Sequence, residues 1–249
     1  MSKYALITGG TGGIGLATAK QLGQAGYKII LNGIDEEQGK TALKELKDLG
    51  VETELFMFDV TDEDQVLKSF YEISEKYEKI DVLVNNAGGL GGRSRFEDME
   101  TSFYRKVMAL NLDSVFFVTR SAIPLLKKGE NPSIVNFTSI AGWNSGGPGA
   151  GVYGTSKGAV TTLTRALAKD LAEYGIRVNA VSPGTIDTPF HQATKEKNID
   201  LFNSWKNNIL LKRFGQPEEV ASVIEFLVSE KASFLTGEII QINGGQDFL

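Results

Sequence analysis

The fold of this chain is decided by the stretch Tyr4-Ala5-Leu6-Ile7-Thr8-Gly9-Gly10-Thr11-Gly12-Gly13-Ile14-Gly15. Its apolar first half is typical of a buried parallel strand, and the segment 16–25 that follows has helical spacing and ends at Gly26. A strand, a glycine loop and a helix N-terminus in this order form a cradle for phosphate, because backbone N–H groups and the helix dipole face the anion without side chains in the way. The stretch therefore predicts a nucleotide-binding unit, with a flexible turn as the alternative.

Two registers of the glycine motif fit this stretch. Gly10, Gly12 and Gly15 spell G-x-G-x-x-G, whereas Thr8, Gly9, Gly13 and Gly15 spell T-G-x-x-x-G-x-G. No Gly-Lys-Ser/Thr follows, which excludes a nucleotide-hydrolysing P-loop.

Short apolar runs alternate with helical segments along the rest of the chain. Strands are expected at 28–32, 54–58, 80–84, 133–137, 177–181 and 238–242. This alternation predicts an α/β fold, a doubly wound parallel sheet with helices on both faces and right-handed crossovers. Ligands of such sheets lie at the carboxyl ends of the strands, where the polar and glycine-rich clusters of this chain fall. No linker or repeat interrupts the pattern, so residues 1–249 form one domain, and the polar stretch at about 189–212 is expected to be a mobile substrate cap.

The composition excludes several classes of function. The 249 residues carry a net charge of −5 and no long basic run, which does not favour nucleic-acid binding. There is no cysteine, and His191 is the only histidine, so thiolate and multi-histidine metal sites are excluded and no metal is expected. No apolar run reaches membrane-spanning length, and the strand-like start leaves no room for a signal peptide. A cytoplasmic protein that does not bind membranes is expected.

The candidate chemistry lies in Tyr153 and Lys157. Residues four apart lie on one face of a helix. A phenol has an ordinary pKa of about 10, and a nearby ammonium favours the phenolate, so the pair is a candidate general acid/base. The plainer alternative is a half-buried tyrosine beside a solvated lysine.

Two further polar residues have two readings each. Asp35 lies about 20 residues past the glycines, where an acid can bond a ribose hydroxyl, but it also precedes a helix that it could cap. Asn111 lies among apolar residues of a helix, where a buried amide needs partners and can also be a satisfied core asparagine. The glycine-rich segment 142–151 is expected to be a pocket wall or lid rather than a regular element.

In this order, the motifs resemble those of the short-chain dehydrogenase/reductase family, and the resemblance covers essentially the whole chain. The matching pieces are Thr8-Gly9…Gly13-Ile14-Gly15, Asp59-Val60, Asn85-Asn86-Ala87-Gly88, Asn111, Ser139, Tyr153…Lys157 and Pro183-Gly184…Thr188. The resemblance implies a single-domain Rossmann-type fold, a nicotinamide dinucleotide and the interconversion of a carbonyl and an alcohol by hydride transfer. It also implies a homotetramer.

The resemblance further implies a role for each motif. The T-G-x-x-x-G-x-G register, with Gly9, Gly13, Ile14 and Gly15, would hold the dinucleotide. Asp59 and Val60 would hold the adenine; Asn85, Ala87 and Gly88 would line its ribose; Pro183, Gly184, Ile186 and Thr188 would lie at the nicotinamide. In the catalytic set, Tyr153 would exchange the proton with the substrate oxygen, and Lys157 would lower the Tyr153 pKa and bond the nicotinamide ribose. Ser139 would hold the substrate oxygen, and Asn111 would hold a water of a proton relay.

The cofactor is expected to be NAD(H), although NADP(H) is not excluded. In the family, an acid at the end of the second strand selects NAD and a basic residue just after it selects NADP, but these positions are Gly33 and Ile34. Asp35 follows one residue later and would repel a 2′-phosphate.

The substrate is expected to be a small carbonyl compound or alcohol bound by a polar pocket. Arg93, Asn144 and His191 fall on loops at the carboxyl edge, and an arginine can bind a carboxylate through two parallel hydrogen bonds. The alternative for Arg93 is a solvated loop arginine.

The loop sequences indicate a narrower substrate class. The runs 85–90 with Arg93, 146–151, 182–188 with Phe190-His191, and 243–246 are similar to those of bacterial reductases of 4-deoxy-L-erythro-5-hexoseulose uronate. This keto uronate is released from alginate and is reduced to 2-keto-3-deoxygluconate. A 3-oxoacyl-thioester reductase and a non-catalytic nucleotide-sensing protein on the same fold are the alternatives.

Overall fold

Within residues 2–248, seven parallel strands form one sheet, in the order β3-β2-β1-β4-β5-β6-β7. The structure is a computed structural model that describes residues 2–248. The strands are β1 (Lys3–Ile7), β2 (Tyr27–Gly33), β3 (Thr53–Met57), β4 (Val82–Asn85), β5 (Ser133–Phe137), β6 (Arg177–Pro183) and β7 (Ile239–Ile242). The strand order reverses between β1 and β4, and both strands end beside the glycine loop. In sheets of this kind that crevice is the ligand site.

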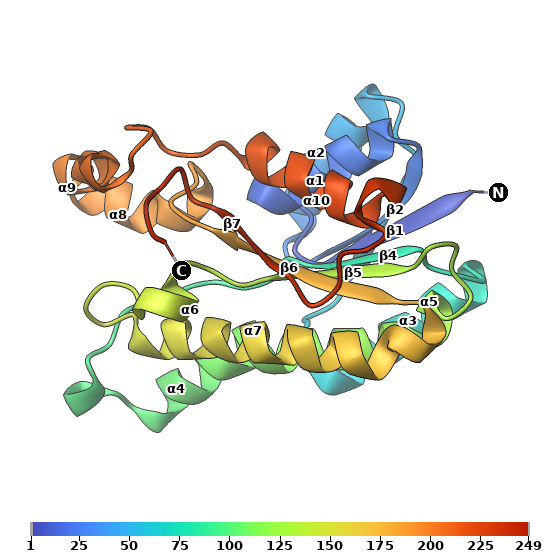
Figure 1. The fold of residues 1–249 in the computed structure, drawn as a ribbon, viewed down its shortest axis with the longest axis horizontal. Coiled ribbons are helices and arrows are strands. Elements are labelled where there is room, and N and C mark those ends of the chain that lie inside the picture. Colours follow the sequence, from blue (N-terminus) through green and yellow to red (C-terminus); the bar gives the residue numbers. More distant parts are fainter. Residues whose placement is uncertain (1, 249) are drawn as a thin grey trace.

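Helices cover both faces of the sheet (Figure 1). One face carries α1 (Gly13–Gln24), α2 (Glu36–Asp48) and α10 (Pro217–Val228); the other carries α3 (Glu63–Lys76), α4 (Thr101–Met108), α5 (Ser114–Leu126) and α7 (Gly151–Leu171). The short helices α6 (Ala141–Asn144), α8 (Gln192–Lys197) and α9 (Ile199–Ser204) lie beyond the carboxyl ends of the strands. Turns of 3-10 helix occupy Phe96–Asp98, Ala172–Tyr174, Pro189–His191, Trp205–Asn208 and Glu230–Ala232. The predicted α/β fold is confirmed.

The core consists of two apolar layers, one on each face of the sheet. Along β1, Ala5 and Ile7 belong to the layer beneath α1, α2 and α10, whereas Leu6 belongs to the opposite layer. The alternation follows from the period of two in a strand, and both sets are fully buried because helices cover both faces. Each leucine or isoleucine of these layers contributes roughly 1.5–3 kcal/mol by leaving water.

Three of the major helices, α2, α3 and α10, begin at a polar residue whose side chain caps the first turn. Asp35 and Asp62 accept hydrogen bonds from the N–H groups of Gln38 (2.9 Å) and Gln65 (3.1 Å), which caps α2 and α3. For Asp35, the structure thus shows the capping role, which was one of its two predicted readings. At α10, Gln216 and Glu219 form a reciprocal capping box.

The helical stretch Thr101–Leu126 is long and apolar enough to cross a membrane by length and composition. It is interrupted by a π-turn at Ala109–Asp113, which carries the buried Asn111, and it packs on the sheet as one of the covering helices. A helix that packs on the core of a water-exposed domain passes the same test, so this stretch is weak evidence for a membrane span.

Two segments are more regular than the sequence suggested. The loop expected at 142–151 begins inside α6, and the cap contains α8, α9 and two 3-10 turns. The cap is ordered by a small apolar cluster of its own, made by Phe202, Ile209 and Phe214 with Trp205 packed against them. Local periodicity missed it because these residues are few and widely spaced; the mobility of the cap stays a prediction.

Candidate active site

The glycine loop has the geometry that the T-G-x-x-x-G-x-G register requires. Gly9 and Gly13 have φ values of +58° and +51°, in the left-handed region that favours glycine. A Cβ at Gly15 would lie 2.4 Å from the carbonyl oxygen of Gly9, so no side chain fits there. At Gly12 the nearest atom to such a Cβ is 3.9 Å away, and glycine is not required for space. The structure therefore favours the second of the two registers.

Three polar residues that the sequence analysis did not assign hold this loop in place. The Asn86 side chain donates to the carbonyls of Thr8 (2.9 Å) and Gly9 (2.8 Å), and the Asn32 side chain accepts from the N–H of Gly9 (3.2 Å). The Thr8 hydroxyl accepts from the N–H groups of Asn86 and Ala87 (3.1 Å each). The available signal was that each asparagine ends or follows an apolar strand next to the loop.

Several predicted cofactor residues come together around the loop. A Cβ on Gly13 would lie 3.7 Å from Thr188, which places the segment after β6 over the start of α1. Ile186 is buried in the same segment, which follows Pro183 and Gly184 at the end of β6. On the other side, a Cβ at Gly88 would lie 3.2 Å from Lys157 Nζ, which brings the loop after β4 next to this lysine.

Other predicted cofactor residues direct their side chains elsewhere. The Asn85 amide is buried and donates to Thr119 and Asn136 (2.9 Å each), so it belongs to a polar chain inside the core and leaves only its backbone for a ligand. Val60 is likewise a core side chain. Asp59 lies at the end of β3, where its Oδ1 accepts from the N–H and hydroxyl of Thr61 (2.8 Å each).

Tyr153 and Lys157 project from the first turns of α7 toward the ends of β5 and β4. Lys157 is 3% exposed, and its Nζ donates to the carbonyl of Phe137 (2.9 Å) at the end of β5. It lies 5.9 Å from the centre of the Tyr153 ring. Ser139 lies two residues past the end of β5 and close enough to Tyr153 to influence the pKa of its phenol. The two residues of the predicted pair and the serine are therefore assembled at one place.

The pKa values of the pair differ from the expectation. Burial lowers the pKa of the Lys157 ammonium to about 8. Burial also raises the pKa of the Tyr153 phenol, and the hydrogen bond with Ser139 opposes this only in part. In the ligand-free protein the desolvation of the phenolate outweighs any lowering by Lys157, and the lowering of the Tyr153 pKa by Lys157 in the cofactor-bound site stays a prediction. The phenol is protonated at neutral pH and available as a proton donor.

Asn111 is a fully buried and fully bonded amide. Its Nδ2 donates to the carbonyls of Gly89 (2.8 Å) and Val107 (2.9 Å), and its Oδ1 accepts from the N–H of Gly89 (3.0 Å). A Cβ at Gly88 would lie 2.9 Å from Oδ1, so Asn111 and Lys157 meet at the same glycine. The amide anchors the loop after β4 to the π-turn. Such π-turns inside α-helices are frequent at functional sites.

The three predicted substrate residues surround the site without forming one cluster. Arg93 is exposed, and its Nη1 donates to the carbonyl of Pro148 (3.0 Å). Asn144 has both ends of its amide in use, because Nδ2 donates to Asp247 (2.7 Å) and Oδ1 accepts from the N–H of Gly146 (2.9 Å). His191 lies in the cap. Asn144 is therefore bound within the protein rather than directed at a ligand.

The cap meets Tyr153 through aromatic rings. The ring of Phe190 lies 6.0 Å from that of Tyr153, and His191 packs against Phe190, Phe202 and Trp205 at 4.9, 5.7 and 5.6 Å. Burial, together with the Lys195 and Arg93 charges, lowers the His191 pKa to about 4, and the Asp187 charge opposes this lowering. His191 is thus neutral near pH 7 and acts as part of an aromatic cluster.

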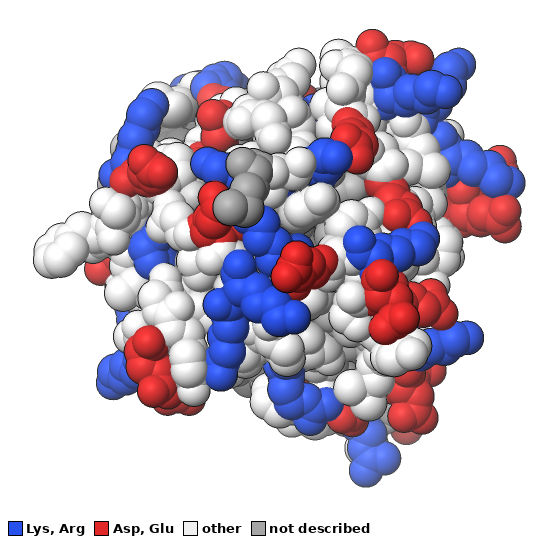
Figure 2. All heavy atoms as spheres, turned by 90° about the vertical axis from the view of Figure 1, so that its right-hand side faces the viewer, with Lys and Arg blue, Asp and Glu red and all other residues white. Residues whose placement is uncertain are grey.

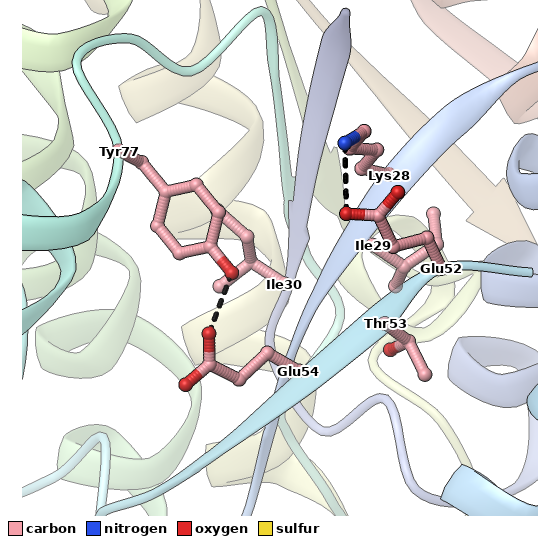
Figure 3. A pocket seen from close by; sticks show the side chains of 7 residues that line it. All are labelled: Lys28, Ile29, Ile30, Glu52, Thr53, Glu54 and Tyr77. Carbon is pink, nitrogen blue, oxygen red and sulfur yellow. Dashed lines mark hydrogen bonds and ion pairs between the residues drawn. The ribbon is translucent and has the colours of Figure 1, made fainter.

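A shallow pocket lies at the opposite end of the sheet, where β2 and β3 begin (Figure 3). Its charged groups are already paired, because Lys28 bonds Glu52 (2.8 Å) and the Tyr77 hydroxyl donates to Glu54 (2.7 Å). Figure 2 shows the face at this end, where basic and acidic side chains are interspersed. Neither feature matches the chemistry at the carboxyl ends.

The residues present fit a nicotinamide dinucleotide. The backbone of the glycine loop faces the crevice between β1 and β4, and the segment 183–188 lies over it from the other side. Within residues 2–248, no three His, Asp or Glu side chains group closely enough to hold a metal ion.

Comparisons with known proteins agree with this site. A family model described as enoyl-(acyl carrier protein) reductase matches residues 9–247. The 3-oxoacyl-[acyl-carrier-protein] reductase FabG of Thermotoga maritima is 41% identical over 98% of this chain and 97% of its own length.

Two solved structures are similar over nearly the whole chain. An NADH-dependent reductase, A1-R′, responsible for alginate metabolism has a TM-score of 0.90 and 35% identity, covering 100% of this chain and 98% of its own. A variant of the actinorhodin polyketide ketoreductase with NADPH has a TM-score of 0.91 and 33% identity, covering 98% and 97%. This protein therefore belongs to the short-chain dehydrogenase/reductase family and is an oxidoreductase that acts on CH–OH and C=O groups.

Proposed function

We propose that the protein reduces the ketone of a small keto sugar acid with NADH. The observation that supports this substrate class is the position of Arg93. Its guanidinium packs on the loop 146–149, and its charge acts on His191, which packs on Phe190, the ring next to Tyr153. A cation on this side of the site suits an anionic substrate. The candidate is 4-deoxy-L-erythro-5-hexoseulose uronate, which would give 2-keto-3-deoxygluconate.

The chain's own residues divide the remaining work. Tyr153, protonated at neutral pH, donates its proton to the ketone oxygen while Ser139 holds that oxygen and stabilises its developing charge. Lys157 lies where it can hold the nicotinamide ribose and stabilise the resulting phenolate. Asn111 keeps the loop at Gly88–Gly89 beside the lysine; the water relay stays a prediction. When bound, the cofactor supplies the hydride.

NAD(H) is the proposed cofactor because the start of α2 is acidic. Asp35 caps that helix, Glu36 and Glu37 follow it, and Lys40 is already paired with both glutamates (3.0 and 2.9 Å). A ribose 2′-phosphate placed here would meet negative charge. The similar alginate reductase is NADH-dependent, whereas the similar polyketide ketoreductase contains NADPH, so the relatives support either nucleotide.

A 3-oxoacyl thioester is the second candidate substrate, and the comparisons favour it. The relative that is 41% identical is a FabG, and the family model is described as an acyl-carrier-protein enzyme. Exposed rings at the site, Phe190 and Trp143, could also contact an acyl chain. Arg93 favours an anionic substrate, and the relatives favour a thioester, so a direct assay has to decide.

The deciding experiment follows nucleotide oxidation by absorbance with NADH and NADPH in parallel. The substrates are the keto uronate, an uncharged ketone of similar size and an acetoacetyl thioester. Oxidation of NADH by the uronate that Tyr153→Phe abolishes supports the proposal, whereas a preference for the thioester moves the protein to the second candidate. Tight NADH binding with no turnover of any substrate would support the sensor alternative.

Arg93→Ala tests the substrate class within the same assay. We expect the KM for the uronate to rise about 10-fold, the loss of one bond to a charged group, while the KM for the uncharged ketone stays within about 2-fold. Arg95→Ala is the matched control, an exposed arginine two residues along the same loop. An equal effect of Arg93→Ala on both substrates contradicts the carboxylate role.

A homotetramer in the cytoplasm is the expected state of the enzyme. Of the apolar run 115–118, Val115 and Val118 are core residues, whereas Phe116 is 45% exposed on α5. Phe116 is therefore the member of the run that a subunit contact could bury, and light scattering of Phe116→Glu against the unchanged protein tests it.

A further inference from the structure

The segment 243–248 runs back over the carboxyl edge of the sheet and contacts both sides of the candidate site (Figure 1). On one side, the Gln246 side-chain oxygen accepts from the N–H (2.8 Å) and the hydroxyl (3.1 Å) of Thr185. On the other side, Asp247 Oδ2 accepts from Asn144 Nδ2 (2.7 Å), a contact between residues 103 positions apart. Asn243 Nδ2 donates to the Asp247 carbonyl (2.9 Å) and braces the segment itself.

The contact between Asp247 and Asn144 is connected to Ser139 and to the helix of Tyr153 through tightly packed backbone. Asn144 ends α6, and α6 is pressed against α7: a Cβ at Gly142 would lie 3.0 Å from the Lys157 carbonyl carbon, and one at Gly154 would lie 2.7 Å from the Ala141 carbonyl oxygen. The Ser139 hydroxyl accepts from the N–H of Ala141 (3.1 Å). Holding Asn144 therefore holds the serine and the start of the tyrosine helix.

The other contact fixes the segment that follows β6. A Cβ at Gly184 would lie 2.7 Å from both Asn243 Cβ and the Gln246 side-chain oxygen, so the backbone of Gly184 packs directly against these two residues and leaves no room for a side chain. The N–H of Gly184 also donates to the carbonyl of Ile242 (2.9 Å). Thr185 is the next residue, and Ile186 and Thr188 follow it over the glycine loop.

We propose that Asp247 and Gln246 are positioning residues of the active site. Together they tie the loop after Ser139 to the loop after β6, and so set the width of the opening that the substrate enters between them. The proposal rests on the proposed catalytic role of Ser139 and Tyr153 at this site. It gives Asn144 a different function from the one predicted from sequence, because its amide holds the wall of the site and does not contact the substrate.

The geometry allows an exchange of the two side chains. Asn144 Oδ1 accepts from the N–H of Gly146, and Asp247 Oδ1 accepts from the N–H of Phe248 (2.9 Å each). If the aspartate and the asparagine change places, each position still has an Oδ1 that accepts from its backbone N–H. The bond between the two side chains can also form again, with position 247 as the donor and position 144 as the acceptor. Asn144→Asp alone instead sets two carboxylates against each other.

The first readout is independent of any substrate. Hydrogen exchange of peptides covering 141–150 is compared in the ligand-free unchanged protein, Asp247→Ala, Asn144→Asp and the double exchange Asn144→Asp/Asp247→Asn. We expect faster exchange in both single variants and recovery in the double exchange. Asp170→Ala, which removes an exposed acid at the end of α7, is the control. Unchanged exchange in both single variants, or no recovery in the double exchange, overturns the proposal.

The second readout is kinetic, on whichever carbonyl substrate the protein reduces. Asp247→Ala should raise its KM roughly 3- to 10-fold, the range for one hydrogen bond, with a smaller effect on kcat and none on NADH affinity. The double exchange should restore the KM. An unchanged KM in Asp247→Ala overturns the positioning role, whereas absence of any turnover by the unchanged protein refutes the proposed function and leaves the exchange result to decide the contact.

Discussion

Lys157 makes the stability of the ligand-free protein depend on pH in a way that can be measured. The lysine is 3% exposed, and burial lowers its pKa from 10.5 to about 8. At about 1.4 kcal/mol per pH unit, this difference corresponds to about 3 kcal/mol. Between pH 8 and 10.5 the unfolded chain binds more protons at this site than the folded chain, so the free energy of unfolding rises with pH. Below about pH 8 Lys157 is protonated in both the folded and the unfolded protein, and burial of its charge lowers the free energy of unfolding by the full amount.

The test compares urea unfolding of the unchanged protein and Lys157→Met, at equal protein concentration and without nucleotide, from pH 7 to about pH 10.5. Other groups titrate in this range, but they are common to both proteins and cancel in the difference. We expect the unchanged protein to gain about 3 kcal/mol relative to Lys157→Met across the range. Lys169→Met, which removes an exposed lysine from the last turn of the same helix, controls for the loss of a lysine. A difference that stays constant within about 0.5 kcal/mol would refute the burial argument.

Three further predictions concern the glycine loop, the helix-capping residue Asp35 and the buried Arg177. Gly15→Ala should weaken NADH binding roughly 10-fold or more, since its Cβ would lie 2.4 Å from a carbonyl oxygen, whereas Gly12→Ala should have little effect; NADH fluorescence titration measures both. Asp35→Ala should lower the free energy of unfolding by about 1 kcal/mol through the lost cap and should raise kcat/KM with NADPH relative to NADH; a fixed cofactor ratio would contradict the charge argument. Arg177→Leu should lower the free energy of unfolding by roughly 2–4 kcal/mol, because the buried guanidinium donates to the carbonyls of Leu227 (2.8 Å) and Ala232 (3.0 Å). The midpoint of urea unfolding measures this loss.

The fold was predictable because its signals are local. Each strand is a short apolar run whose buried faces both need cover, and Gly9 and Gly13 mark backbone conformations that other residues rarely adopt. Tyr153 and Lys157 were found for the same reason, because four residues of helix put two side chains on one face. Short-range geometry was sufficient for all of these.

The environment of the site was less predictable because it depends on distant parts of the chain. The bond that occupies Asn144 comes from Asp247, and the pKa of Tyr153 is set by how much of the whole domain covers the phenol. Asn85 has the sequence position of a ligand residue, yet its amide completes a buried chain with Thr119 and Asn136. Which side chains face a ligand and which face the core is decided by tertiary packing.

The π-turn at Ala109–Asp113 changes the direction in which the side chains of α5 point relative to those of α4, within the long helical stretch Thr101–Leu126. The N–H of Ser114 donates to the carbonyl of Ala109, five residues back, so one residue more than a regular helix needs is accommodated in this turn. Removing that residue would turn α5 by about 100° relative to α4. Val115 and Val118 would then rotate off the core, and Asn111 could no longer serve Val107 and Gly89 together. The extra residue of the π-turn thus lets α5 direct its apolar side chains at the sheet while Asn111 keeps its bonds at the site.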